Sequence, residues 1–119
     1  SCVSNETATG RLVNVNDFID FLFSLKPANP EKIFVAAVAG PVTPYVVKAD
    51  VISFGAGEEP QPGIQHSCTG GTNGSEYADP AVRIRQLLSA FGPNSYFGNI
   101  CADDFGPTMQ SIAQVMVAP

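Results

Sequence analysis

The stretch Ile33-Phe34-Val35-Ala36-Ala37-Val38-Ala39 is continuously apolar and ends where Gly40 and Pro41 begin a turn. Apolar and polar residues do not alternate along it, which is typical of a strand buried on both faces of a parallel sheet. We therefore expect this stretch to form a strand at the centre of the core.

Three segments around this strand have the pattern of amphipathic helices. They share a polar capping residue at the start, apolar residues spaced by three or four, and a Gly or Pro near the end in the first two. We expect the first helix to begin at Asn16 and end at Lys26-Pro27. The second is expected to begin at Asp79-Pro80 and end at Gly92-Pro93, and the third to begin after Asp103-Asp104 and end near Val117. The broad apolar face from Phe18 to Leu25 is expected to be buried in the core rather than exposed for docking.

The remaining segments are predicted to be short strands and loops. Ser95 to Ile100 is expected to be a second strand, and Tyr45–Val47 and Val51–Phe54 two short strands around Lys48–Asp50. Residues 55–78 are rich in Gly and Pro and are expected to form one long loop, and residues 1–13 an irregular arm. The alternation of helices and strands predicts an α/β fold with flanking helices around a doubly wound, mostly parallel sheet.

The predicted sheet has too few strands to cover both edges of its central strand. A strand that is apolar on both faces needs a strand neighbour on each side, and the chain offers one short parallel candidate and a doubtful hairpin. Residues 1–119 are therefore expected to be a single domain or the C-terminal part of one. The missing strands would come from a cleaved segment or from a partner chain.

The segments 16–27, 33–40, 78–83 with the preceding Cys68 loop, and 100–105 resemble, in their order and spacing, the C-terminal half of von Willebrand factor A-like domains of secreted or lipid-anchored bacterial surface proteins. The resemblance spans residues 11 to 117. It implies that Ile33–Ala39 and Ser95–Ile100 are the last two strands on one side of a doubly wound sheet.

The resemblance also bears on whether the chain binds a divalent metal. Such domains usually bind a divalent metal through an Asp-X-Ser-X-Ser motif at the end of their first strand, and this motif is absent from all 119 residues. No cofactor and no metal ligand are therefore expected in this chain. A divalent metal would be possible only through an absent N-terminal half.

Charge and hydropathy limit the partners. The net charge is −5, with 6 Lys and Arg against 11 Asp and Glu, so the chain can neutralise few phosphates and nucleic acid is not an expected partner. Gly40, Pro41 and Pro44 interrupt the longest uncharged stretch, so no membrane span is expected. Charged residues make up only 14%, which suits a secreted or cell-surface protein, or one that covers part of its surface with a partner.

Cys2, Cys68 and Cys101 lie too far apart in sequence for the usual zinc or iron–sulfur spacings. In an oxidising compartment a Cys68–Cys101 disulfide is expected, which leaves Cys2 to pair with a partner chain or with a missing segment. Three reduced thiols are the alternative.

The candidate chemical groups have simpler explanations. His66 lies close to Ser67 and Cys68, but we interpret it as an exposed loop histidine, since sequence neighbours in a loop rarely align as nucleophile and base. Asp103-Asp104 is interpreted as a helix cap rather than a calcium site, and Glu58-Glu59 as a solvated pair. The segment 70–75 lacks the Gly-Lys-Ser/Thr ending of a phosphate loop and is interpreted as a turn.

No catalytic residue is therefore expected. Our main hypothesis is a non-enzymatic extracellular module for adhesion or protein–protein interaction, of the von Willebrand factor A-like type. The alternative is a subunit of an extracellular filament or coat, in which a partner chain completes the sheet. A third hypothesis is a secreted hydrolase whose other catalytic residues lie upstream.

Overall fold

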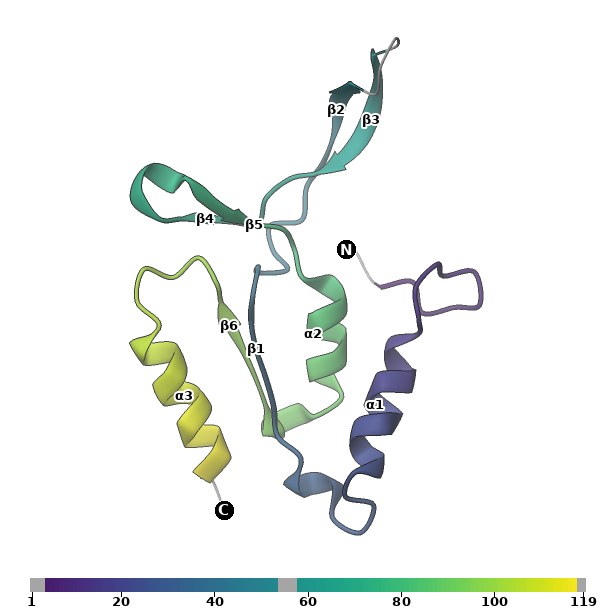
Figure 1. The fold of residues 1–119 in the computed structure, drawn as a ribbon, viewed down its shortest axis with the longest axis vertical. Helices are drawn as coiled ribbons and strands as arrows, with labels where there is room; N and C mark the ends of the chain where they lie inside the picture. Colours follow the sequence, from purple (N-terminus) through teal and green to yellow (C-terminus); the bar gives the residue numbers. More distant parts are fainter. Residues whose placement is uncertain (1–3, 54–57, 118–119) are drawn as a thin grey trace.

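A computed structural model describes residues 4–53 and 58–117. It is a mixed α/β structure with three α-helices and three two-stranded sheets (Figure 1). The elements, in chain order, are α1 Val15–Ser24, η1 Pro30–Lys32, β1 Val35–Ala39, β2 Val47–Ser53, β3 Glu58–Ile64, β4 Cys68–Gly70, η2 Thr72–Gly74, β5 Glu76–Ala78, α2 Val82–Ser89, η3 Gly92–Asn94, β6 Ser95–Asn99 and α3 Gly106–Val117.

The expected central strand is β1, and it pairs in parallel with β6. Val35 lies opposite Ser95 and Ala39 opposite Asn99. The backbone N–H of Ile100 continues the ladder by donating to the carbonyl of Ala39 at 3.1 Å. The α/β class and the parallel pairing of these two strands are thus confirmed.

Helices α2 and α3 cover opposite faces of this sheet. On one face the guanidinium of Arg85 in α2 lies 5.5 Å from the ring centroid of Phe97 in β6. On the other face Gly98 lies so close to α3 that a Cβ on it would come within 2.7 Å of Cγ2 of Thr108. Because successive strand residues point to opposite faces, these two contacts fix the α/β/α layering. Figure 1 shows α3, the sheet, α2 and α1 side by side from left to right.

The N-cap of helix α1 lies two residues earlier than predicted. Asn14 is the N-cap, and its side-chain oxygen accepts a hydrogen bond from the backbone N–H of Asn16 at 2.9 Å. The predicted cap at Asn16 is therefore wrong, because Asn14 meets the same requirement one position before the buried Val15. The helix packs against α2, and the rings of Phe23 and Phe91 lie 4.8 Å apart.

The predicted loop over residues 55–78 is wrong, because this region holds three strands. β3 pairs antiparallel with β2 as a hairpin, which projects from the end of the parallel sheet in Figure 1. The two short strands predicted on either side of Lys48–Asp50 are instead the single strand β2. β4 and β5 form a second, smaller antiparallel ribbon, with Cys68 opposite Ala78.

Two prolines explain why the sequence pattern of β3 was misleading. The N–H of Gln65 donates to the carbonyl of Val46 at 2.9 Å, which fixes the alternation of hydrogen bonds along the ladder. Pro60 and Pro62 then fall at positions whose nitrogen points away from β2, where no N–H is needed. Prolines that look like strand breakers are thus compatible with an edge strand.

Helix α2, in contrast to α1, begins later than predicted. Its N-cap is Ala81, which makes no side-chain capping hydrogen bond, and its first residue is Val82. Asp79 does not cap the helix, because its carboxylate instead contacts His66. The predicted start at Asp79-Pro80 is therefore wrong by two residues. α3 begins at Gly106, with Pro107 in its first turn as expected.

The core is small. Among the described residues the buried apolar side chains are Val15, Ala39, Leu88 and Phe91. β1 is buried only at its last residue, and Ala36 is exposed, so the expectation that this strand is buried on both faces is wrong for most of its length. The accessible surface is 8312 Å², whereas a compact monomer of 12.5 kDa exposes about 6,200 Å².

The molecule is also extended. The Cα radius of gyration is 17.5 Å, against about 13.5 Å for a compact domain of this length. The principal dimensions are 57 × 41 × 23 Å, so the chain forms a thin slab. No helix within the described residues is long and apolar enough to cross a bilayer.

Candidate functional site

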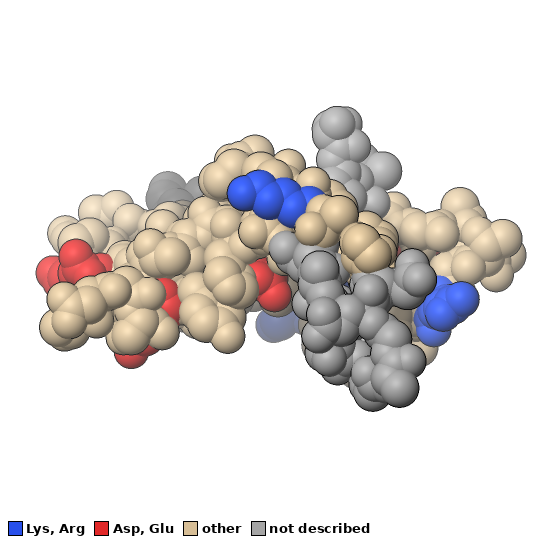
Figure 2. All heavy atoms as spheres, turned by 90° about the horizontal axis from the view of Figure 1, so that it is seen from above, with Lys and Arg blue, Asp and Glu red and all other residues tan. Residues whose placement is uncertain are grey.

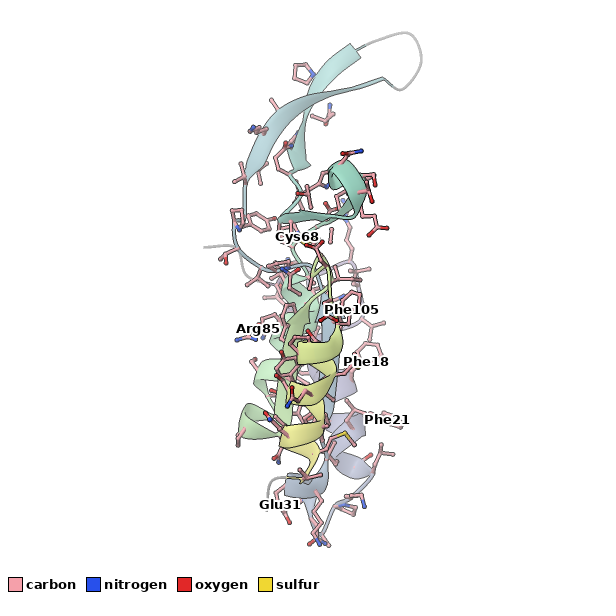
Figure 3. The ribbon with its side chains drawn as sticks, turned by 90° about the vertical axis from the view of Figure 1, so that its left-hand side faces the viewer. Phe18, Phe21, Glu31, Cys68, Arg85 and Phe105 are labelled. Carbon is pink, nitrogen blue, oxygen red and sulfur yellow. A yellow bond between two sulfur atoms is a disulfide. The ribbon has the colours of Figure 1, made fainter. Side chains whose placement is uncertain are left out.

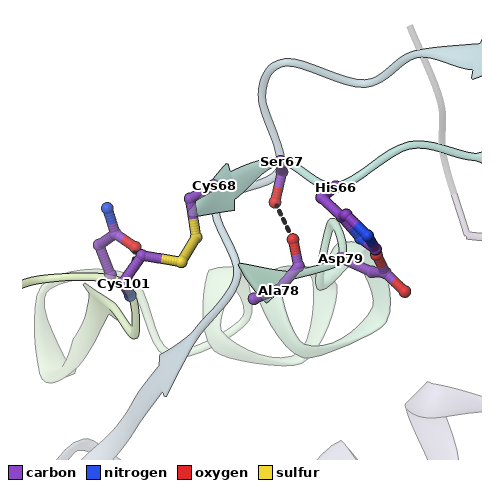
Figure 4. The surroundings of a disulfide bond; sticks show 7 residues. His66, Ser67, Cys68, Ala78, Asp79 and Cys101 are labelled. Atoms are coloured by element: carbon purple, nitrogen blue, oxygen red, sulfur yellow. Dashed lines mark hydrogen bonds and ion pairs between the residues drawn. A yellow bond between two sulfur atoms is a disulfide. The ribbon is translucent and has the colours of Figure 1, made fainter. Parts of the chain in front are cut away.

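Cys68 and Cys101 form a disulfide bond in the structure, with an S–S distance of 2.08 Å and a Cα–Cα distance of 6.1 Å. The bond joins the start of β4 to the segment that follows β6 (Figure 4). It thus attaches the β4–β5 ribbon to the connection between β6 and α3. Cys2 lies outside the described residues.

His66 lies in a small polar cluster beside this disulfide (Figure 4). Its Nδ1 is 2.7 Å from Oδ1 of Asp79, and its ring stacks on Tyr77 with centroids 3.8 Å apart. A carboxylate at Nδ1 orients an imidazole in the way that hydrolases use. The His66 side chain is 47% exposed, so this orientation occurs at the surface.

The residues around His66 do not supply a nucleophile. The hydroxyl of Ser67 is turned inward and donates to the carbonyl of Ala78 at 3.2 Å, and Ser67 is buried. Cys68 is held in the disulfide and cannot act as a thiolate. Ser67 and the cysteine therefore support the fold of the ribbon.

Asp104 forms a hydrogen bond with the first residue of α3. Its Oδ1 accepts a hydrogen bond from the N–H of Gly106 at 2.8 Å, as expected for a carboxylate near a helix N-terminus. Asp103 is exposed. Among residues 4–53 and 58–117, no three His, Cys, Asp or Glu side chains gather in a way that could hold a metal ion.

The remaining sequence candidates fall on turns or outside the described side chains. Residues 71–74 form the turn between β4 and β5, where Gly71, Asn73 and Gly74 have positive φ angles of 70°, 64° and 66°. Glycine and asparagine tolerate this conformation best, which explains the composition of the segment. The side chains of Glu58 and Glu59 lie outside the described part of the structure.

Sequence reasoning missed an ion pair between the N-terminal arm and α2. Arg83 Nε is 3.1 Å from Oε1 of Glu6, and Val15 donates its backbone N–H to Oε2 of Glu6 at 2.6 Å. The Glu6 side chain also accepts a hydrogen bond from Ser4. These donors, with Arg83 as the largest cause, lower the pKa of Glu6 to about 2.

A cavity of about 310 Å³ lies beside this ion pair, between the base of the hairpin and the start of α2. Tyr45, Ile64 and Ile84 line it, and its one charged lining residue, Arg83, is bound to Glu6. The cavity is open and lined mostly by apolar side chains.

The apolar face of α1 is only partly buried. Val15 is buried and Phe23 packs on Phe91, but Phe18, Phe21 and Leu25 are 50%, 61% and 58% exposed. These three residues share one face, because they are spaced by three and four positions. The expectation that the whole apolar face is buried is therefore wrong, and we refer to Phe18, Phe21 and Leu25 as the α1 stripe.

A second exposed apolar group lies at the start of α3. Phe105 and Met109 are 42% and 51% exposed, and the N–H of Met109 donates to the carbonyl of Phe105, so they share one face of the helix start. Figure 3 shows Phe18, Phe21 and Phe105 on one side of the molecule and Arg85 on the other. These exposed apolar side chains make this surface a candidate for binding a partner.

Comparison with known proteins adds no relative. No protein-family model matches the chain, and no curated protein or solved structure is detectably similar to it.

Proposed function

We propose that this chain is a non-enzymatic extracellular module for adhesion or protein–protein interaction, built as the C-terminal part of a von Willebrand factor A-like domain. The observation that carries the proposal is the accessible surface of 8312 Å², about 2,100 Å² more than a compact monomer of this mass exposes. Stable interfaces cover about 800 Å² on each partner, and permanent ones more. The excess surface is thus of the size that a permanent partner covers.

The arrangement of the strands supports the proposed architecture. A parallel pair with helices on both faces is the repeating unit of doubly wound sheets. The Cys68–Cys101 disulfide favours an oxidising compartment, and so an extracellular position. The net charge of −5, and basic side chains that Figure 2 shows set apart among uncharged residues, favour a protein partner over nucleic acid.

A second candidate function is a subunit of an extracellular filament or coat. One observation favours it: β1 has a strand neighbour on one edge only within the described residues. In such an assembly the strands of the next chain would complete the sheet.

The solution mass of the purified chain separates these candidates. We expect sedimentation velocity to show a monomer that binds the dye ANS through exposed apolar surface until a partner is added. A mass that grows with concentration would favour the assembly subunit. A compact monomer that binds no ANS would contradict both proposals.

The hydrolase hypothesis is tested separately. The chain is screened against chromogenic esters, phosphates and peptides, with His66→Ala and Asp79→Asn as variants. We expect no turnover above the buffer rate. Turnover that both variants abolish would overturn the non-enzymatic proposal, because it would show that the His66–Asp79 pair acts on a substrate.

A further inference from the structure

One edge of β1 carries unpaired backbone groups. In a parallel sheet the backbone N–H and C=O groups of alternate residues point to the strand on one side and to the strand on the other. The carbonyl of Ala39 accepts a hydrogen bond from the N–H of Ile100, so the backbone groups of Ala39, Ala37 and Val35 point toward β6. The N–H and C=O groups of Ala36 and Val38 therefore point to the opposite edge. No strand in residues 4–53 and 58–117 pairs with that edge.

The sequence protects another edge of the molecule but not this one. In the hairpin, Pro60 and Pro62 remove the N–H groups that would point outward from β3, which prevents further strand pairing there. β1 consists of Val35-Ala36-Ala37-Val38-Ala39 and contains no proline, charge or bulge. An unprotected apolar edge is expected to be covered in the functional protein.

Exposed apolar side chains lie in the helices on both faces of the sheet. Arg85 lies over Phe97 of β6, and in Figure 3 Phe18 and Phe21 are on the side of the molecule opposite to Arg85. The α1 stripe is on a helix that packs on α2, and Phe105 and Met109 are at the start of α3, which packs on β6 from the other face of the sheet. We therefore expect the side chains of a strand added to β1 to face the α1 stripe on one side of the sheet and Phe105 and Met109 on the other.

The topology sets the direction of the added strand. β1 and β6 are parallel and connected through α2, and such crossovers are right-handed in nearly all proteins, so we expect this one to be right-handed. α1 packs on α2, on the same face, so the same rule places a parallel strand connected through α1 on the open side of β1. α1 thus has the position of a crossover helix above a strand that continues the sheet.

We propose that the open edge of β1 binds a strand of a partner polypeptide that runs parallel to β1 and is apolar on both faces. This inference rests on the proposed function and names the partner's chemistry. Backbone bonds to Ala36 and Val38 give affinity, and the α1 stripe with Phe105 and Met109 selects apolar side chains on both faces.

The first experiment measures binding of a labelled probe peptide by fluorescence anisotropy. The probe is an alternating Val-Ile segment with Ala at its centre and two Lys at each end for solubility. We expect the chain to bind it, and a control peptide in which every second apolar residue is Glu to bind at least about tenfold more weakly. Equal binding of the two peptides would overturn the proposal that the bound strand is apolar on both faces.

Variants of β1 test the backbone bonds. Ala36→Pro removes an N–H from the open edge but none from the β1–β6 ladder, and we expect it to weaken probe binding by about tenfold or more. Ala36→Val keeps the N–H and is expected to keep the affinity. Unchanged binding by Ala36→Pro, with circular dichroism like that of the parent chain, would overturn the proposal.

A second measurement on the parent chain covers the case in which Ala36→Pro does not fold. Hydrogen exchange of the Ala36 and Val38 amides is expected to slow when the probe binds. A nitroxide at the N-terminus of the probe should broaden NMR signals near Val35, and one at the C-terminus signals near Ala39. Fast exchange in the complex, or the reverse pattern of broadening, would contradict a parallel strand.

Sedimentation equilibrium of the chain alone identifies the other possible occupant. Self-association that Ala36→Pro abolishes would show that a second copy occupies the edge, and would overturn the proposal of a separate partner. If Ala36→Pro changes neither partner binding nor self-association, the proposed interaction function stands. Only the proposal that the open edge of β1 is the binding site is then refuted. The two proposals therefore fail in distinguishable ways.

Discussion

Glu6 and Arg83 are 77 residues apart in the sequence, yet their side chains form an ion pair in which Arg83 Nε lies 3.1 Å from Glu6 Oε1. Glu6 also accepts the N–H of Val15, the first residue of α1. One carboxylate thus holds together the N-terminal arm, α1 and α2. Removal of this carboxylate is expected to loosen the packing of all three parts.

Glu6→Gln should therefore lower the melting temperature by a few degrees, because the neutral amide binds Arg83 and the helix N-terminus less well. Differential scanning calorimetry at neutral pH measures the change. Glu31→Gln, which removes the same charge from an exposed residue, serves as the control and should leave the melting temperature nearly unchanged. Equal effects of the two substitutions would refute the structural role of Glu6.

The same carboxylate predicts an acid dependence of stability. The pKa of Glu6 falls from 4.5 to about 2 in the folded chain, so the unfolded state binds a proton first as the pH drops. The contribution of Glu6 is complete above pH 4.5 and is lost as the pH falls toward 2. Urea denaturation across this window should show a steep loss of stability, and the slope should be smaller in Glu6→Gln. Parallel curves would contradict the lowered pKa.

Loss of the disulfide is expected to destabilise the chain by roughly 3 to 4 kcal/mol, from the entropy of the closed loop in the unfolded state. The loop spans a sequence separation of 33 residues. Cys101→Ser and the Cys68→Ser/Cys101→Ser double variant are compared with the parent by urea denaturation. The double variant should lose no more than the single one, since both remove the same bond. Additive losses would mean that the two cysteines act separately.

Gly98→Ala is expected to cost about 1 to 3 kcal/mol, because its Cβ would lie 2.7 Å from Cγ2 of Thr108. Thr108→Ser removes that methyl group. In the Gly98→Ala background this second substitution should recover part of the loss, as measured by thermal unfolding. Failure of the double variant to recover stability would place the strain elsewhere.

Phe21→Ala and Phe23→Ala remove the same side chain from two faces of α1. Phe23 packs on Phe91 at 4.8 Å, so its loss should cost about 2 to 4 kcal/mol. Phe21 is 61% exposed, and its loss should cost well under 1 kcal/mol while lowering ANS binding. Chemical denaturation and dye fluorescence measure both variants. A similar loss of stability in the two would mean that the α1 stripe is buried in solution.

The strands of the parallel sheet could be predicted because each follows a local pattern. β1 lies in an apolar stretch before Gly40-Pro41, and β6 lies between Gly92-Pro93 and Cys101. The hairpin could not be predicted in the same way, since local pattern treats Pro60 and Pro62 as breaks. Only the register against β2 shows that their nitrogens point outward.

The candidate surface was harder to predict from the sequence. An amphipathic pattern shows that the residues from Phe18 to Leu25 have an apolar face, but it does not show which of them another element covers. The Glu6–Arg83 pair left no signal, because no periodicity joins residues so distant in the chain. Asp79 has the sequence features of a helix cap, and only the fold brings it to His66.

The position of the disulfide also determines how the molecule would respond to proteolysis. A cut in the turn between β4 and β5 would leave Cys68 in one fragment and Cys101 in the other, so the nicked chain would stay covalently joined until reduced. A cut within β2 or β3 would place both cysteines in the C-terminal fragment. The N-terminal fragment, with α1 and β1, would then be held only by noncovalent contacts such as the β1–β6 ladder, and could exchange onto another copy.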